Sequence, residues 1–202
     1  MRQLTALDSS LTIIPQEREF NMLLKSLNSF LLVIDIQSRL APAIDKGSSV
    51  INNSCWLMEI AKELDVPVIA TEQYPQGIGE SVPPIKERLE AKNILQKMHF
   101  SALKEPEIKQ RLAELNRKQV VIVGTEAHVC VFQTAADLLE AGYQVYLVEE
   151  AVGSRKAQDK KLALKRLKQM GAQIVCKEMV AFEWLEKSGT DTFRKVVKEW
   201  IK

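Results

Sequence analysis

Six short apolar runs, each long enough for one strand, constrain the fold of this chain more than any other feature. Segments whose apolar residues recur at helical spacing separate most of these runs. The expected strands cover residues 31–36, 66–71, 94–98, 120–123, 143–148 and 173–176. Such alternation is typical of a doubly wound α/β fold, in which a mostly parallel sheet carries helices on both faces. We therefore predict a six-stranded, Rossmann-like sheet.

The size and charge of the chain restrict the class of partner. Its 202 residues fit one domain and can bury a core without metals or disulfides. The net charge of +2, with acids and bases mixed along the chain, gives no basic stripe for nucleic acid and no polybasic membrane patch. No apolar run is long enough to span a bilayer. We expect a small-molecule substrate and neither a nucleic-acid nor a membrane partner.

The cysteines indicate the compartment. Cys55, Cys130 and Cys176 are odd in number and widely separated, so a disulfide framework is not expected and a reducing, cytoplasmic location fits better. We expect Cys176 to point into the core. Residues 1–29 lack the apolar centre of a secretory signal and are assigned as an N-terminal extension. Residues 30–202 then form the single domain.

Two charged residues stand near the ends of buried runs. Asp35 ends an otherwise apolar strand, and burying its carboxylate is costly unless partners compensate, so it either caps a loop or works in a site. Lys97 ends the third run, although Lys is among the residue types least often buried. Ligands of such sheets bind beyond the carboxyl ends of the strands. Both residues are therefore placed at the expected ligand crevice.

Cys130 follows the fourth run after a short turn. Gly124 ends that strand, and helical spacing begins at Cys130 and continues to Gly142. A thiol at a helix N-terminus is favoured as thiolate, and backbone N–H groups around Glu126 and Cys130 are candidates for an oxyanion hole. The alternative interpretation is a small, inert, buried side chain. A second helix is expected to begin with Ser154 as its N-terminal cap.

An acid, an ammonium group and a thiol at one edge of a sheet make a complete set for acyl transfer. Asp35 can accept the thiol proton of Cys130, and Lys97 can stabilise the developing charge. The same set could be retained for ligand capture alone, so a catalytically silent small-molecule-binding or scaffold protein is the alternative hypothesis. A dinucleotide oxidoreductase is disfavoured, because no Gly-rich turn follows the first strand.

These segments are similar to a known family. Residues 31–37, residues 97–102, and residues 124–131 together with Thr134 resemble the three signature segments of the isochorismatase-like cysteine hydrolase superfamily. Residues 71–77 and 151–155 resemble the isochorismatase domain-containing hydrolases of unassigned substrate in particular. The resemblance runs from about Phe30 to the last helix. It implies the fold that the strand pattern predicts.

The resemblance also implies roles. Cys130 would attack an amide or similar carbonyl, Asp35 would be the general base for the thiol and later for water, and Lys97 would give electrostatic support. A cis peptide bond between Thr125 and Glu126 would aim the oxyanion-hole N–H, and the chain would form a homo-oligomer. No cofactor is implied.

Departures from the family narrow the substrate. Metal-dependent nicotinamidases hold a metal with an Asp and histidines between the first and third motifs, where this chain has only His99, so no metal is expected. True isochorismatases lack the cysteine nucleophile. A small amide, carbamoyl compound or ester remains. We expect five residues to line its pocket, although loop aromatics such as Tyr74 often only cover the core edge: Gln73, Tyr74, His99, Phe100 and His128.

Overall fold

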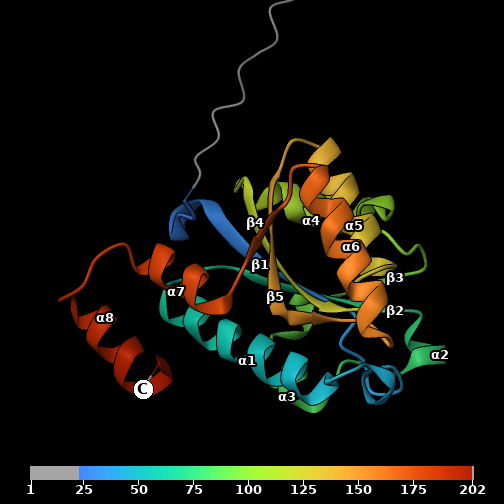
Figure 1. Ribbon diagram of the computed structural model, residues 1–202, viewed down its shortest axis with the longest axis horizontal. Coiled ribbons are helices and arrows are strands. Elements are labelled where there is room, and N and C mark those ends of the chain that lie inside the picture. The colour runs from blue at the N-terminus through green and yellow to red at the C-terminus, as the bar shows by residue number, and fades with distance from the viewer. Residues whose placement is uncertain (1–22, 202) are drawn as a thin grey trace, which may run out of the picture.

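The structure, a computed structural model, describes residues 23–201 and contains the predicted parallel sheet (Figure 1). The strand order is β3-β2-β1-β4-β5-β6, and every neighbouring pair is parallel. The chain winds outward from β1 in both directions, which confirms the doubly wound α/β fold. The strands are β1 (Ser29–Ile34), β2 (Val68–Gln73), β3 (Ile94–Lys97), β4 (Gln119–Thr125), β5 (Gln144–Gly153) and β6 (Gln173–Val175).

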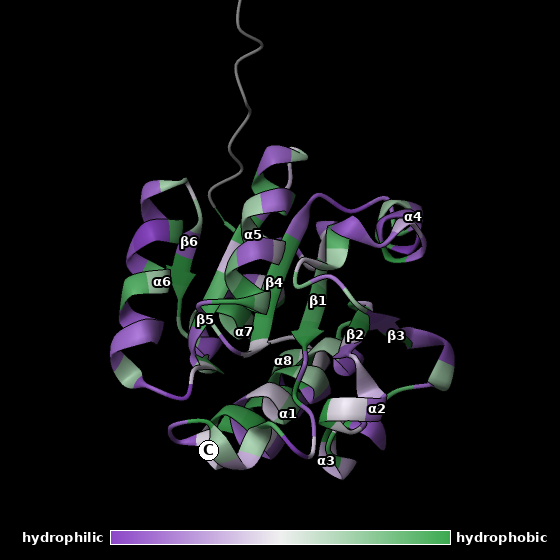
Figure 2. Cartoon of the chain, turned by 90° about the vertical axis from the view of Figure 1, so that its right-hand side faces the viewer, coloured by the Kyte–Doolittle hydropathy of each residue, from purple (hydrophilic) through white to green (hydrophobic). Residues whose placement is uncertain are grey.

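Helices cover both faces of the sheet, as Figures 1 and 2 show. Two further α-helices, α2 and α3, are single turns that follow β2. Within residues 23–201 no helix is long and apolar enough to cross a membrane. The helices are α1 (Gly47–Glu63), α2 (Pro75–Ile78), α3 (Pro83–Lys86), α4 (Pro106–Glu114), α5 (Cys130–Glu140), α6 (Ala157–Gln169), α7 (Lys177–Leu185) and α8 (Asp191–Val196), which continues as a π-helix (Val197–Ile201).

The two faces follow from the period of two in the strands. Leu31 and Val33 of β1 belong to the core cluster that α1, α7 and α8 cover, whereas Leu32 and Ile34 belong to the cluster that α4, α5 and α6 cover. Successive side chains of a strand point to opposite faces, so a strand buried on both sides has to be apolar throughout. All six residues of β1 are buried. This explains the unbroken apolar run in the sequence.

Two sequence-based expectations are wrong, and both concern strand ends. The strand β5 continues past Glu149 and Glu150 through a bulge against β4, because Ile122 pairs with Leu147 but Gly124 pairs with Val152. The helix α6 therefore begins only at Ala157, and Ser154 does not cap it.

The second correction concerns Cys176, which is exposed. The strand β6 ends at Val175, and Cys176 occupies the N-cap of α7, where its Sγ accepts a hydrogen bond from the backbone N–H of Met179 at 3.4 Å.

The end of the N-terminal extension packs on the domain. Leu24 is fully buried in the cluster on the α1 side, and its N–H donates to the carboxylate of Glu183 on α7 at 2.7 Å. Residues 1–22 of the extension lie outside the described residues, so the division between residues 1–29 and residues 30–202 stays a prediction.

Gly124 lets β4 approach β1 at the end where the site forms. Its φ is +144°, and a Cβ on this residue would lie 2.2 Å from the carbonyl oxygen of Ile34. That distance is far below any van der Waals contact. Any larger residue would push apart the two central strands.

We predict that Gly124→Ala lowers the free energy of unfolding by about 3 kcal/mol, the upper end of the usual cost of overpacking. Gly142→Ala is the matched control, because Gly142 also has a positive φ but a Cβ added to it would meet nothing within 4 Å. Backbone strain alone should lower the free energy of unfolding of Gly142→Ala by about 1 kcal/mol. Urea denaturation of both variants measures the difference. Equal losses would contradict this account of the strand contact.

Candidate active site

The sheet topology brings the three predicted residues to one edge. Asp35 follows β1 directly and has a left-handed φ of 52°, Lys97 is the last residue of β3, and Cys130 is the first residue of α5 after β4. The strand β1 lies between β2 and β4, and the chain winds away from it in opposite directions. This switch point is where open α/β sheets bind ligands.

Asp35 and Lys97 form a fully buried ion pair. Asp35 Oδ2 lies 2.7 Å from Lys97 Nζ, and both side chains have 0% exposure. The Nζ also donates to Gln73 Oε1 at 2.6 Å and to the carbonyl oxygen of Phe100 at 3.1 Å. Asp35 Oδ1 accepts a hydrogen bond from Thr71 Oγ1 at 2.7 Å. Burial raises the pKa of Asp35, while Lys97 and Thr71 oppose that rise.

The thiol of Cys130 lies against this pair. Its residue is 5% exposed, its Sγ lies 4.0 Å from Gln73 Oε1, and it interacts with the Asp35 carboxylate. Asp35 Oδ2 has no well-aligned hydrogen-bond donor, although Lys97 is close to it. The Asp35 carboxylate is therefore the group beside the thiol that can accept its proton.

The expectation of a favoured thiolate is wrong. Burial is the largest influence on Cys130, and with the negative charge of Asp35 it raises the pKa of the thiol to about 12, whereas Lys97 acts in the opposite direction. The positive end of α5 does not outweigh these effects. The thiol of Cys130 is therefore neutral at ordinary pH.

The turn before α5 also differs from expectation. No peptide bond in residues 23–201 is cis, so the Thr125–Glu126 bond is trans. Glu126 instead takes a left-handed φ of 54°, and this residue reverses the chain between β4 and α5. Its carbonyl oxygen accepts from the N–H of Val129 at 2.8 Å and of Val131 at 3.3 Å. The residue whose N–H a cis bond was expected to aim thus has a trans peptide bond and a positive φ.

The side chain of Glu126 belongs to a network that sequence reasoning missed. The buried carboxylate lies 2.5 Å from Arg155 Nε and 3.2 Å from His128 Nδ1, and His128 Nδ1 also lies 3.0 Å from Ser154 Oγ. His128, expected to line the substrate pocket, thus packs on the end of β5. Ser154 was expected only as a helix cap, and Arg155 was noted only as part of the segment 151–155.

The other predicted lining residues divide into two groups. Gln73 lies inside the site, where its Nε2 donates to the carbonyl oxygen of Met98 at 2.8 Å and its Oε1 accepts from Lys97. Tyr74, His99 and Phe100 are exposed, with Tyr74 at 46% and Phe100 at 52%. These three follow β2 and β3 at the same edge. Their contact with a substrate stays a prediction.

Glu105 fixes the loop that holds Lys97, and no pattern in the sequence singles it out. Its Oε1 accepts from the N–H groups of Met98 at 2.8 Å and His99 at 2.9 Å, and lies 2.9 Å from His99 Nδ1. Hydrogen bonds from the backbone of this loop lower the pKa of Glu105 to about 2. An ionised carboxylate thus sets the loop whose carbonyl oxygen at Phe100 binds Lys97.

No metal site accompanies this arrangement in the part of the chain that the structure describes, where no group of three or more His, Cys, Asp or Glu side chains is placed to hold an ion. The groups available for catalysis are the neutral thiol of Cys130, the carboxylate of Asp35 with its raised pKa, and the buried ammonium group of Lys97. Together they can move one proton and stabilise one negative charge.

Solved structures share the fold. The structure of MAR1 ribonuclease from Caenorhabditis elegans superposes with a TM-score of 0.82 at 37% identity, covering 89% of this chain and 92% of that chain. The YcaC gene product of Escherichia coli, an octameric hydrolase of unknown specificity, also gives 0.82, at 23% identity over 89% of this chain and 91% of its own. The second likeness shows the fold alone.

Sequence comparisons agree with the resemblance of the three motifs. The Isochorismatase domain model matches residues 29–179, which include all the site residues described above. Isochorismatase family protein 1B from Dictyostelium discoideum is 37% identical over 175 residues, 84% of this chain and 84% of its own. The chain therefore belongs to the isochorismatase domain family and has its hydrolase fold.

Proposed function

We propose that this protein is a cysteine hydrolase that cleaves a small amide, carbamoyl compound or ester through a thioester at Cys130. The observation that carries the proposal is the buried ion pair of Asp35 and Lys97, 2.7 Å apart, against the thiol of Cys130. A buried ion pair is weak evidence for stability. Perturbed acids beside a thiol in a ligand crevice are typical of catalytic sites.

In the first step Cys130 Sγ attacks the substrate carbonyl carbon as its proton passes to Asp35 Oδ2. The carbonyl oxygen becomes an oxyanion, which the N–H groups of Glu126 and Cys130 would bind while Lys97 balances the charge. The intermediate then collapses. The bond from carbon to nitrogen or oxygen breaks, and the leaving group takes the proton from Asp35.

In the second step water attacks the thioester carbon and gives a proton to Asp35. The carbon–sulfur bond breaks, and the departing sulfur recovers a proton from Asp35 as the acid product leaves. The same carboxylate serves as base and acid in both steps. Its raised pKa suits this double role, because a stronger base takes the proton of a weakly acidic thiol more readily.

The proposed substrate is a small molecule with an apolar or aromatic part. Tyr74 and Phe100 are exposed at the edge where β2 and β3 end, next to the loop that Glu105 fixes. We propose that they contact the substrate together with Gln73, His99 and His128. The C. elegans relative is named a ribonuclease, and an RNA oligonucleotide therefore belongs in a substrate screen.

Self-association and a cytoplasmic location also stay proposals. The E. coli neighbour is named as octameric, and we propose a homo-oligomer for this chain, which sedimentation analysis would test.

We predict that Cys130→Ala lowers turnover of any accepted amide or ester about a thousandfold or more, because the nucleophile is lost. Cys176→Ala is the matched control, since this exposed cysteine lies at the start of α7 and should leave turnover unchanged. Product release from a panel of amides, carbamates, esters and an RNA oligonucleotide measures both. A silent binding protein would show ligand binding without turnover. Amide, carbamate or ester turnover that survives Cys130→Ala would sink the thioester mechanism, and cleavage of RNA alone would point to a different reaction.

We predict an acid limb in the pH profile of kcat/KM. The active form needs ionised Asp35 and protonated Cys130, and burial raises the pKa of Asp35 above its ordinary 3.8 and that of the thiol to about 12. The rate should therefore fall as the pH drops through a value above 3.8, and ionisation of the thiol should cause no loss at neutral or mildly alkaline pH. An acid limb at or below 3.8 would contradict the assignment of Asp35 as the base.

We predict that Glu105→Gln lowers kcat about tenfold, because small displacements of a catalytic group reduce the rate steeply. It should also move the acid limb to higher pH, since a loosened loop holds Lys97 less firmly and Lys97 opposes the rise in the pKa of Asp35. Glu107→Gln on the exposed surface of α4 is the control. A variant that loses activity with an unchanged pH profile would indicate a structural role only.

A further inference from the structure

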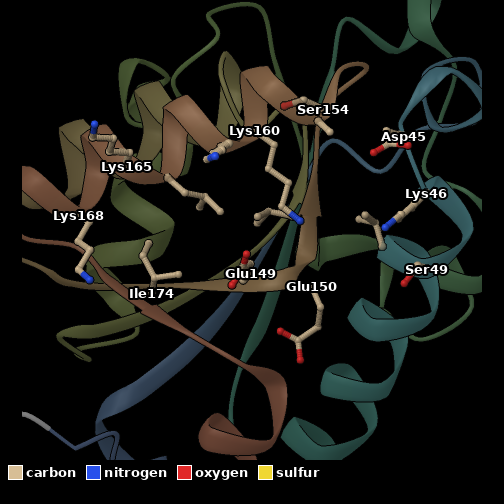
Figure 3. A pocket seen from close by; sticks show the side chains of 15 residues that line it. Asp45, Lys46, Ser49, Glu149, Glu150, Ser154, Lys160, Lys165, Lys168 and Ile174 are labelled. Carbon is tan, nitrogen blue, oxygen red and sulfur yellow. The ribbon is translucent and has the colours of Figure 1, made fainter.

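A cavity lies apart from the candidate active site. It has a volume of about 830 Å³ and lies between the start of α1, the second half of β5 and α6 (Figure 3). Its lining includes none of Asp35, Lys97 or Cys130. Sites for small molecules are typically about 300–1,000 Å³, so this cavity can hold an ordinary metabolite.

The floor of the cavity is apolar. Val50 from α1, Val152 from β5 and Leu164 from α6 are buried side chains that line it, and Ile174 from β6 completes the floor. Val50 belongs to the core cluster on the α1 side, and Val152 and Leu164 belong to the cluster on the α6 side; all three are almost wholly covered by the protein itself, with exposures of 3%, 0% and 8%. Apolar area removed from water by a ligand contributes roughly 25 cal/mol per Å². The apolar area that remains open to an occupant is that of Ile174 and of the methylene stems of the lining lysines.

The walls are cationic. Four lysines of α6 and one at the start of α1 line the cavity together with three carboxylates. Glu150 is already engaged, because its Oε1 accepts from the backbone N–H of Lys177 at 2.9 Å. The lysines are Lys46, Lys160, Lys161, Lys165 and Lys168, and the carboxylates are those of Asp45, Glu149 and Glu150.

Lys160 has the central place among these groups. Figure 3 shows it between Ser154 on one side and Glu149 and Glu150 on the other. Burial lowers the pKa of this lysine, although the nearby carboxylates oppose the effect. Its ammonium group is thus partly removed from water. An anionic group on a ligand would give the Lys160 ammonium group a charge-assisted hydrogen bond in place of its lost hydration.

We propose that this cavity binds a small phosphate monoester, with its apolar body on Ile174 and the methylene stems of the lysines and its phosphate against Lys160 and the neighbouring ammonium groups. The excess of five lysines over three carboxylates matches a phosphate monoester, which carries about −1.5 to −2 charges at neutral pH. The site does not involve Cys130. Its binding can therefore be measured in a variant that lacks the proposed nucleophile.

Calorimetric titration of the full chain with three probes tests whether the cavity requires both an apolar body and a phosphate group on its ligand. Hexyl phosphate carries both the apolar body and the phosphate, inorganic phosphate carries the charge alone, and hexanol carries the apolar body alone. We expect hexyl phosphate to bind at least about tenfold more tightly than either of the others, and to bind Cys130→Ala equally well. Absence of hexyl phosphate binding, or equal binding of inorganic phosphate, overturns the proposal.

Two variants locate the binding. Lys160→Met keeps the length of the side chain but removes its charge, and should weaken hexyl phosphate at least about tenfold. Lys109→Met, on the exposed surface of α4, should leave the affinity unchanged. Thermal unfolding checks that both variants are folded. If Lys160→Met binds hexyl phosphate as tightly as the unaltered chain does, the proposal is overturned. It is also overturned if the protein self-associates at high concentration and thereby displaces hexyl phosphate, because a second copy of the chain would then be the occupant.

Discussion

The buried ion pair of Asp35 and Lys97 is the interaction on which the site depends. Two charges with 0% side-chain exposure are costly to desolvate, and their attraction compensates only when the remaining hydrogen bonds are also made. Thr71 and Gln73 from β2 and the carbonyl oxygen of Phe100 make those bonds. The ends of three adjacent strands and one loop are therefore fixed relative to one another. Loss of either charge would leave the other buried and unpaired.

Burial, together with the charge of Asp35, explains why Cys130 rests as a thiol. The difference between the ordinary pKa of 9.0 and the value of about 12 in the folded chain corresponds to about 4 kcal/mol against the thiolate. A helix N-terminus typically contributes about 1 kcal/mol in favour of an anion. Burial and the charge of Asp35 therefore win over the helix. In the proposed mechanism, proton transfer to Asp35 would therefore accompany attack by the thiol.

The sequence predicted those features that strand periodicity and topology control, and missed those that tertiary packing controls. Asp35 and Lys97 were conspicuous because charged residues interrupt apolar runs, and parallel strands place such residues at one edge. The state of the thiol was predicted wrongly because its burial is not a local property. Glu105 looked like any solvated acid, since its role depends on a loop that folds back onto α4. The bulge in β5 concealed the strand that continues past Glu149.

The ion pairs of Glu126 offset an unfavourable negative charge beside the proposed oxyanion hole. A carboxylate on the same residue as an oxyanion-binding N–H would repel the developing negative charge, by about 4 kcal/mol for unit charges 4 Å apart near a protein surface. Arg155 lies 2.5 Å from that carboxylate, and His128 lies 3.2 Å from it on the other oxygen. The cation at Arg155 offsets the charge of Glu126. A carboxylate paired in this way can fix the turn at Glu126 and still leave the neighbouring N–H groups suited to an anion.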